Sequence, residues 1–378
     1  MTEPLSMQKL LQQNLESYAQ HHPLSRRQRQ VCHHILDCRT EALGGMQLQC
    51  NHCGDPQVLY YACRDRHCPR CQKKATEAWS IKQQANLLPV TYHHLVFTLP
   101  HQLNPWIALH PKVIYGLLFE AVWATLKAFG LKRLKGRMGM VAILHTWGQS
   151  LIRHVHLHCL VPGGALNDQG RWQSTTGDYL FPVRALSRRF RGIFVSRLRQ
   201  SIANGELNRL TDPKQIKSTM DQLMATDWAV YTKPCLHYSR TVVDYLARYS
   251  HRIALSDQRL QGLDDQGKVL LSYKDYKDRG KHKIMTLGPQ ELIRRFLLHV
   301  LPKGFMRIRQ YGILANSCRQ KCLIQIREAL AVEKADPEEA ALAAIDAVFD
   351  GYPCPKCKQG QMQVIAFLLP NWYRYEAG

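Results

Sequence analysis

The sequence predicts an α+β fold built on an antiparallel sheet with flanking helices, a small cysteine-rich domain before it and a helical tail after it. Strand-like runs of β-branched and aromatic residues lie next to each other across short polar turns, which is typical of hairpins. Helix-like segments occur among them without the regular alternation of a parallel sheet. Seven of the 13 cysteines precede residue 72, and this clustering sets the front of the chain apart.

Composition divides the 378 residues into three expected domains. Residues 1–85 form the cysteine- and arginine-rich front, residues 86–310 the central domain, and residues 311–378 a helical tail that contains a Cys-Pro-Lys-Cys knuckle. A chain of this length can bury a core in each of two or three domains.

The central domain is expected to begin with a strand that stops at Pro100 and a helix that ends at Gly130. Two further strands, joined by a short polar turn, are expected to form a hairpin. The expected strands are 91–99, 138–147 and 151–161, with short strands around the turn at 264–267, and the expected helices are 106–129, 183–204, 241–249, 290–300 and 337–349.

The net charge is strongly positive, with 51 Lys and Arg against 29 Asp and Glu, or +22. Such a charge attracts polyanions, and nucleic acid is the expected one. A basic protein with some other role is the alternative. No apolar run predicts a membrane span, and the N-terminus lacks the pattern of a signal peptide, so a cytoplasmic protein is expected.

The front cysteines are expected to bind zinc rather than to form disulfides. Two C-x2-C pairs can close a tetrahedral site that leaves no open position, so this zinc would be structural. The expected ligands are Cys50, Cys53, Cys68 and Cys71, with Cys63 and His67 in reserve. Nearby basic residues are expected to contact phosphate, namely Arg64, Arg66, Arg70, Lys73 and Lys74.

The tail knuckle, Cys354 and Cys357, supplies only half of such a site. Cys318 and Cys322 are four residues apart and share a helical face, so they could complete it. An unmetallated pair is an equal alternative.

The strand at 151–161 carries three histidines on one face, because strand side chains alternate. His154, His156 and His158 share that face, and apolar residues occupy the other. Imidazoles on one open face suit a metal ion, whereas a histidine pair that merely packs is the alternative.

Tyr245 and Tyr249 are expected one turn apart on a helix, and therefore on one face of it. A phenol attacks a phosphodiester at neutral pH only when a cation polarises the phosphate. Two such tyrosines would permit two successive strand transfers, and packing of both rings into a core is the alternative.

The histidine strand followed by Tyr245-Leu-Ala-Arg-Tyr249 resembles the HUH endonuclease superfamily, named for its His-hydrophobic-His motif, and within it the two-tyrosine transposases of the insertion-sequence-91 family. The resemblance extends in order from Cys38 to Asn316. Its segments are CRTEALGG, CRDRHCPRCQ, HLVFTLPHQLN, HVHLHCLVPGG, YLARYSHRIALS, YKDYKDRGKHK and FLLHVLPKGFMRIRQYGILAN.

The resemblance implies an HUH-type sheet preceded by a zinc-binding domain that recognises DNA. It makes Tyr245 and Tyr249 the nucleophiles and His156 and His158 ligands of a catalytic Mg2+ or Mn2+. Members usually add a third polar ligand just before the histidine strand, and Gln149 is expected in that place. The product of the first cleavage would be a 5′-phosphotyrosine and a free 3′-OH.

Basic residues near these motifs are expected to hold single-stranded DNA, namely Arg248, Arg252, Lys274, Lys277, Arg279 and Lys281. A solvated helix end or loop is the alternative for them. The expected partners are transposon ends, target DNA and host replication proteins. A rolling-circle replication initiator would use the same chemistry, and a non-catalytic zinc-ribbon regulator is the rival from another class.

Overall fold

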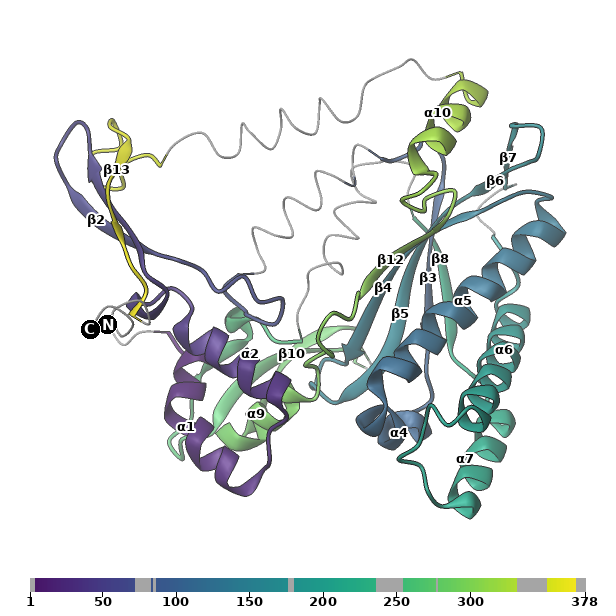
Figure 1. Cartoon of the computed structure of the whole chain (residues 1–378), viewed down its shortest axis with the longest axis horizontal. Coiled ribbons are helices and arrows are strands. Elements are labelled where there is room, and N and C mark those ends of the chain that lie inside the picture. The colour runs from purple at the N-terminus through teal and green to yellow at the C-terminus, as the bar shows by residue number, and fades with distance from the viewer. Residues whose placement is uncertain are drawn as a thin grey trace.

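The computed structural model covers the whole chain and describes residues 4–71, 83, 86–175, 180–235, 254–276, 278–331 and 352–371 (Figure 1). Within these residues helices mix with antiparallel sheets, which confirms the predicted α+β class.

A five-stranded antiparallel sheet forms the centre of the larger part of the molecule. The predicted hairpin supplies two adjacent strands, and the predicted strand at 91–99 pairs with the second of them. The order is β12 (Ile308–Gly312), β4 (Gly139–Trp147), β5 (Arg153–Pro162), β3 (Tyr92–Thr98) and β8 (Val230–Cys235).

One face of this sheet is the main hydrophobic core. Alternate residues of β5, such as Val155, Leu157 and Cys159, are fully buried there together with Phe97 of β3. The helices that cover this face are α4 (Asn104–Leu109), α5 (Pro111–Arg133), α6 (Val183–Ala203) and α7 (Pro213–Ala225) (Figure 1).

The opposite face is divided along the strands. At one end Val141, Ile143 and Leu160 pack against α10 (Arg319–Ala329). Towards the other end the same face carries histidines of β3, β4 and β5 instead of apolar residues.

A second core joins the first helices to a later sheet. Residues 250 or more positions apart in the sequence are adjacent in this core. Met7 N donates to Asp257 at 2.9 Å, and the side chain of Gln28 donates to the carbonyl of Leu297 at 3.2 Å. The elements are α1 (Met7–His21), α2 (Arg26–Asp37), α9 (Pro289–Leu297), β9 (Leu260–Leu263), β10 (Val269–Asp275) and β11 (Lys281–Leu287).

A third sheet joins the two ends of the chain. β13 (Met362–Leu368) pairs with β1 (Gly45–Cys50), which also pairs with β2 (Pro56–Tyr60). In Figure 1 this sheet, with the yellow β13 and the purple-blue β2 on either side of β1, lies at one end of the molecule. The expected three-domain division stays a prediction, although this sheet draws strands from the first and the third expected domains. The remaining strands, β6 (Gly164–Leu166) and β7 (Trp172–Ser174), form a small ribbon.

Two expectations for the helix at 106–129 were wrong. A break at His110-Pro111 divides it into α4 and α5, and α5 continues through Gly130 to Arg133. Gly130 serves close packing instead of termination, because an added Cβ would lie 2.4 Å from the sulfur of Met138. The other helices at 183–204 and 290–300 are confirmed as α6 and α9, whereas those expected at 241–249 and 337–349 lie outside the described residues.

By length and composition the helix α5 is long and apolar enough to cross a membrane. No such segment was expected from the sequence. More than half of this stretch is buried inside the protein, against the sheet and α6. Its apolar composition is that of a core helix.

Candidate active site and zinc clusters

The histidine cluster lies on the open end of the central sheet. His156 and His158 of β5 lie beside His145 of β4, which pairs directly with His156. Each of the three side chains offers a nitrogen, and these atoms all lie within 4.8 Å of one another. Small rotations of the rings would close them around one ion.

Hydrogen bonds at Nδ1 orient the rings of the two β5 histidines, His156 and His158. Nδ1 of His156 donates to the backbone oxygen of His154 at 2.9 Å, and this leaves the lone pair on Nε2. Nδ1 of His158 lies 2.8 Å from Nε2 of His94 on β3. When His158 donates in that bond, its Nε2 carries the lone pair that a cation requires.

Within the cluster, burial keeps the imidazole of His156 neutral. Removal from water lowers the pKa of His156 to about 4, and the neighbouring His154 lowers it further. Burial also lowers the pKa of His94 to about 4. Neutral imidazole is the form that binds a metal, so the donor set fits a divalent cation at neutral pH.

The structure brings His145, and not the expected Gln149, beside His156 and His158. The backbone oxygen of Gln149 accepts from Arg259, and its side-chain oxygen accepts from the backbone N–H of Lys274 at 3.4 Å. The Gln149 side chain is therefore turned towards β10. His145 was missed, although hairpin register contains the signal: the pairing of Val141 with Leu160, continued along both strands, places His145 opposite His156.

His154 shares the face of His156 but is not in the cluster. Its ring lies 5.0 Å from that of His156 and 5.4 Å from that of His101, which belongs to the short 3-10 helix His101–Leu103. The apolar register predicted for the other face of β5 is confirmed by the complete burial of Leu157.

The predicted nucleophiles Tyr245 and Tyr249 lie outside the described residues, as do Arg248, Arg252 and Lys277. The other predicted DNA contacts lie on the hairpin of β10 and β11. Lys274 lies 5.8 Å from the ring centre of Tyr276, Arg279 is in the turn at φ 49°, and Lys281 pairs with Asp278 at 3.4 Å. Because Gln149 contacts Lys274, this basic hairpin lies next to the turn of the histidine hairpin.

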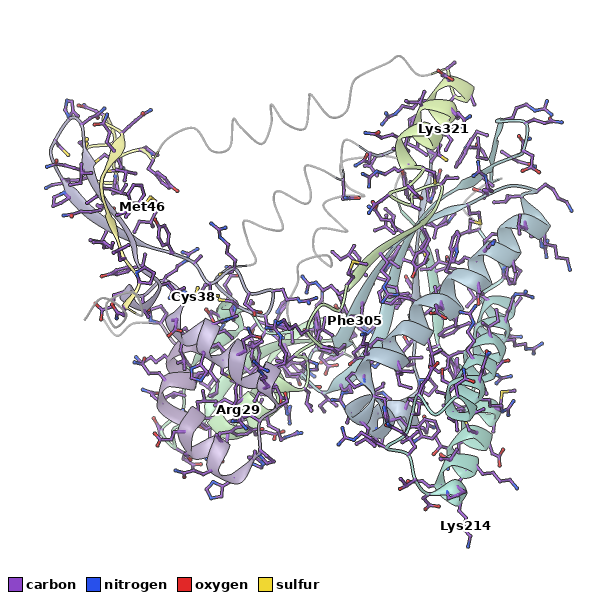
Figure 2. All side chains as sticks on the ribbon, viewed as in Figure 1. Arg29, Cys38, Met46, Lys214, Phe305 and Lys321 are labelled. Carbon is purple, nitrogen blue, oxygen red and sulfur yellow. The ribbon has the colours of Figure 1, made fainter. Side chains whose placement is uncertain are left out.

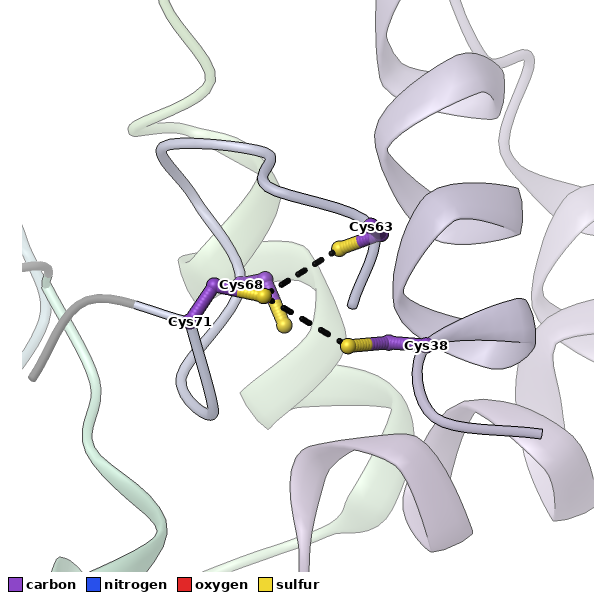
Figure 3. Close-up of side chains that lie close together, drawn as sticks. All are labelled: Cys38, Cys63, Cys68 and Cys71. Carbon is purple, nitrogen blue, oxygen red and sulfur yellow. Dashed lines mark hydrogen bonds between the residues drawn. The ribbon is translucent and has the colours of Figure 1, made fainter. Parts of the chain in front are cut away.

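Four cysteines of the front region converge on one point (Figure 3). Cys38 follows α2, and the other three, Cys63, Cys68 and Cys71, lie in the loop after β2. The sulfur of Cys71 lies 3.5 Å from that of Cys38 and 3.6 Å from that of Cys63. A tetrahedral zinc with sulfur at 2.3 Å requires sulfurs about 3.8 Å apart, so the spacing fits zinc and is far too long for a disulfide.

The chemistry of this cluster is also compatible with a cation. The hydrogen bond with Cys38 raises the pKa of both Cys63 and Cys68, so all four residues become thiolates together only beside a compensating positive charge. Zinc supplies that charge when it binds.

The single zinc site predicted from Cys50, Cys53, Cys68 and Cys71 is therefore corrected. The structure divides these pairs between two clusters: Cys68 and Cys71 join Cys38 and the reserve Cys63, whereas Cys50 and Cys53 join Cys354 and Cys357. A C-x2-C pair specifies half a tetrahedron, and only the fold selects the other half. Cys318 and Cys322, expected beside the tail knuckle, pack instead against the central sheet.

His67, the second reserve, is not a ligand but a link in a buried network. Asp65 accepts from His67 Nδ1 at 2.8 Å, from His34 at 2.9 Å and from Arg27 at 3.1 Å. Burial raises the pKa of Asp65, but the hydrogen bonds from His67 and His34 outweigh burial, so its pKa is well below the ordinary value. The carboxylate is thus ionised inside the protein.

This network fastens the zinc loop to the central part of the molecule. Nε2 of His67 accepts from the backbone N–H of Leu301 at 3.1 Å, and Arg66 donates to the backbone oxygen of Phe305. Phe305 lies where the N-terminal helices meet the central sheet (Figure 2). Arg66 and Arg70 were expected to contact phosphate, yet both donate to protein acceptors; Arg70 bonds Gln8 at 2.6 Å. Lys73 and Lys74 lie outside the described residues.

Two family models match this chain, one over the cysteine-rich front and one over the region that contains the histidine cluster. A family model described as a transposase zinc-binding domain matches residues 10–99, and one described as a putative transposase matches residues 139–321. No solved structure gives a significant match.

Two curated proteins are similar along most of their length. The putative transposase y4qJ of Sinorhizobium fredii is 40% identical over 369 residues, which covers 93% of this chain and 92% of that protein. The transposase for insertion sequence element IS801 of Pseudomonas savastanoi pv. phaseolicola is 29% identical over 314 residues, or 80% and 74% of the two chains.

Proposed function

The chain belongs to the insertion-sequence-91 family of transposases, and we propose that it moves DNA by a rolling-circle route. In this proposal it cuts and rejoins single strands through phosphotyrosine links. The observation that carries the proposal is the cluster of His145, His156 and His158, three imidazoles on one face of the central sheet.

These three side chains are the proposed ligands of the catalytic cation. A cation held there would polarise a scissile phosphate. A set of three nitrogens favours a first-row transition ion, so of the two cations expected from the sequence Mn2+ suits the site better than Mg2+, which prefers oxygen. His94 acts behind His158 by accepting its Nδ1 proton.

In the proposed reaction the hydroxyl oxygen of Tyr245 or Tyr249 attacks phosphorus. A new P–O bond forms to the tyrosine while the bond to the 3′ oxygen breaks, and the departing 3′ oxygen gains the proton that the phenol loses. The products are a 5′-phosphotyrosine and a free 3′-OH that host polymerase can extend. The second tyrosine, or the freed hydroxyl, then rejoins the strand to the target.

The single strand is proposed to follow the basic hairpin of β10 and β11 towards the histidines. Lys274, Arg279 and Lys281 lie on that hairpin, next to the turn that contains Gln149. Arg248, Arg252 and Lys277 are proposed to extend this path. The overall charge of +22 adds a long-range attraction for DNA. The zinc module is proposed to recognise the ends of the element, in a protein that works in the cytoplasm on the nucleoid.

The test is an adduct assay on denaturing gels. Single-stranded oligonucleotides with each element end, labelled at the 3′ end, are incubated with the protein and Mn2+. We expect a denaturant-resistant adduct with the wild type and with the control Tyr352→Phe. Tyr352 precedes the tail knuckle and does not belong to the two-tyrosine motif. The Tyr245→Phe, Tyr249→Phe double variant should bind the DNA but form no adduct.

The rivals give different results in the same assay. A non-catalytic regulator forms no adduct with any divalent cation although it binds DNA. A replication initiator forms an adduct on a replication origin but not on element ends. Either result would overturn the proposal.

A further inference from the structure

The second cysteine cluster joins residues that are 300 positions apart. The sulfur of Cys50 lies 3.7 Å from that of Cys357, and the sulfur of Cys53 lies 3.7 Å from that of Cys354. These separations are those of a tetrahedral zinc site, at about 3.8 Å, and not of disulfides, at about 2 Å.

Both halves of the cluster are folded in the same way. The N–H of Gly54 bonds the carbonyl of Cys50 at 3.1 Å, and the N–H of Lys358 bonds the carbonyl of Cys354 at 2.9 Å. The two closing residues have left-handed backbones, with φ of 70° at Gly54 and 58° at Lys358. Lys358 therefore makes the same turn as Gly54, although its Cβ makes the left-handed conformation unfavourable.

Backbone N–H groups point at the sulfurs. His52 N and Cys53 N both lie 3.4 Å from the sulfur of Cys50, and Gly360 N lies 3.4 Å from that of Cys357. The two loops thus direct backbone N–H donors at the sulfurs of Cys50 and Cys357, as loops that hold a metal-bound thiolate do.

The two loops also fit each other closely. An added Cβ on Gly360 would lie 2.6 Å from the sulfur of Cys50, so only glycine permits this approach. Asn51 and Gln361 exchange two hydrogen bonds at 2.9 and 3.0 Å, and Lys356 pairs with Asp55 at 3.0 Å. The pairing of β1 with β13 continues directly from this contact.

We propose that Cys50, Cys53, Cys354 and Cys357 bind a second structural zinc ion, which holds the C-terminal strand β13 on the N-terminal module. The zinc-binding domain model ends at residue 99 and so does not include the second pair of ligands. The N-terminal module is then complete only when the far end of the chain has been made. This inference does not depend on the phosphotyrosine chemistry.

The test measures the number of zinc ions per full-length chain, by elemental mass spectrometry after dialysis. The wild type should hold two zinc ions per chain, both surrounded by four sulfurs in X-ray absorption. Cys354→Ser with Cys357→Ser should hold one, and hydrogen exchange at the β1 and β13 amides should speed up while that of β4 and β5 is unchanged.

A matched control is the double variant Cys318→Ser, Cys322→Ser. It alters the other cysteine pair of the tail, which packs against the central sheet, and it should keep two zinc ions. One zinc per chain in the wild type would overturn the proposal without any variant, and so would two ions in the Cys354 and Cys357 variant. Because adduct formation is measured separately, this failure is distinct from failure of the proposed transposition chemistry.

Discussion

Nε2 of His94 lies 2.8 Å from Nδ1 of His158, so a histidine of β3 supports a predicted metal ligand on β5. Such a bond sets which nitrogen of the ligand carries the proton and which way the ring faces. We expect His94→Ala to weaken Mn2+ binding by about 10- to 100-fold, measured by calorimetric titration. His94→Gln, whose amide oxygen can accept the same proton, should recover much of the affinity. Equal affinity in the alanine variant and the wild type would show that His94 only fills space.

The exchange of Gln149 for His145 can be tested by a pair of variants. His145→Ala should weaken Mn2+ binding by at least about 10-fold, because it removes a proposed ligand. Gln149→Ala should bind Mn2+ as the wild type does, because that side chain bonds the backbone of Lys274 instead. The reverse order of the two affinities would restore Gln149 as the third ligand.

The Asp65 network should contribute strongly to stability. Asp65→Asn leaves its partners Arg27, His34 and His67 without a charge to bond, and removal of one member of a buried ionic network costs about 3 kcal/mol. Urea unfolding measures this loss, and Asp168→Asn, at an exposed turn, is the control. Zinc content should not change, since all thiols remain. A stability equal to the wild type would mean that the network does not fasten the zinc loop.

His299 makes stability depend on pH. It is fully buried, donates to the carbonyl of Leu151 at 2.9 Å, and burial lowers its pKa to about 4. In the unfolded chain His299 becomes protonated near pH 6.5, whereas in the native state it stays neutral until about pH 4. The free energy of unfolding therefore falls as the pH drops from about 6.5 towards 4. His299 should account for about 1 kcal/mol of loss between pH 7.5 and 5.5. His299→Asn should show a smaller loss over that interval in chemical unfolding, and an equal loss would contradict the assignment.

The local parts of the fold could be predicted from the sequence. In the β4–β5 hairpin, β5 alternates histidines with apolar residues and follows an apolar strand across a short turn, so its residues alone define it. His145 was missed because only the register of two strands brings it beside His156. Gly130 was misread as a helix end because its role depends on Met138, a contact across the fold.

The cysteines show the same limit. Each C-x2-C pair predicted a half-site, but the choice of partner is made by tertiary structure. The partner of Cys50 and Cys53 lies 300 residues away on a knuckle that sequence spacing could not connect to them. Cys38 was not expected as a ligand because it stands alone at the end of α2.

We propose that a tyrosine of this chain becomes covalently joined to DNA. Mass spectrometry of the proteolysed adduct, formed with Mn2+ and a single-stranded element end, tests this directly. We expect a 5′-phosphorylated nucleotide on the peptide that contains Tyr245 and Tyr249. Attachment to any other residue, or an adduct that survives in the double phenylalanine variant, would contradict it.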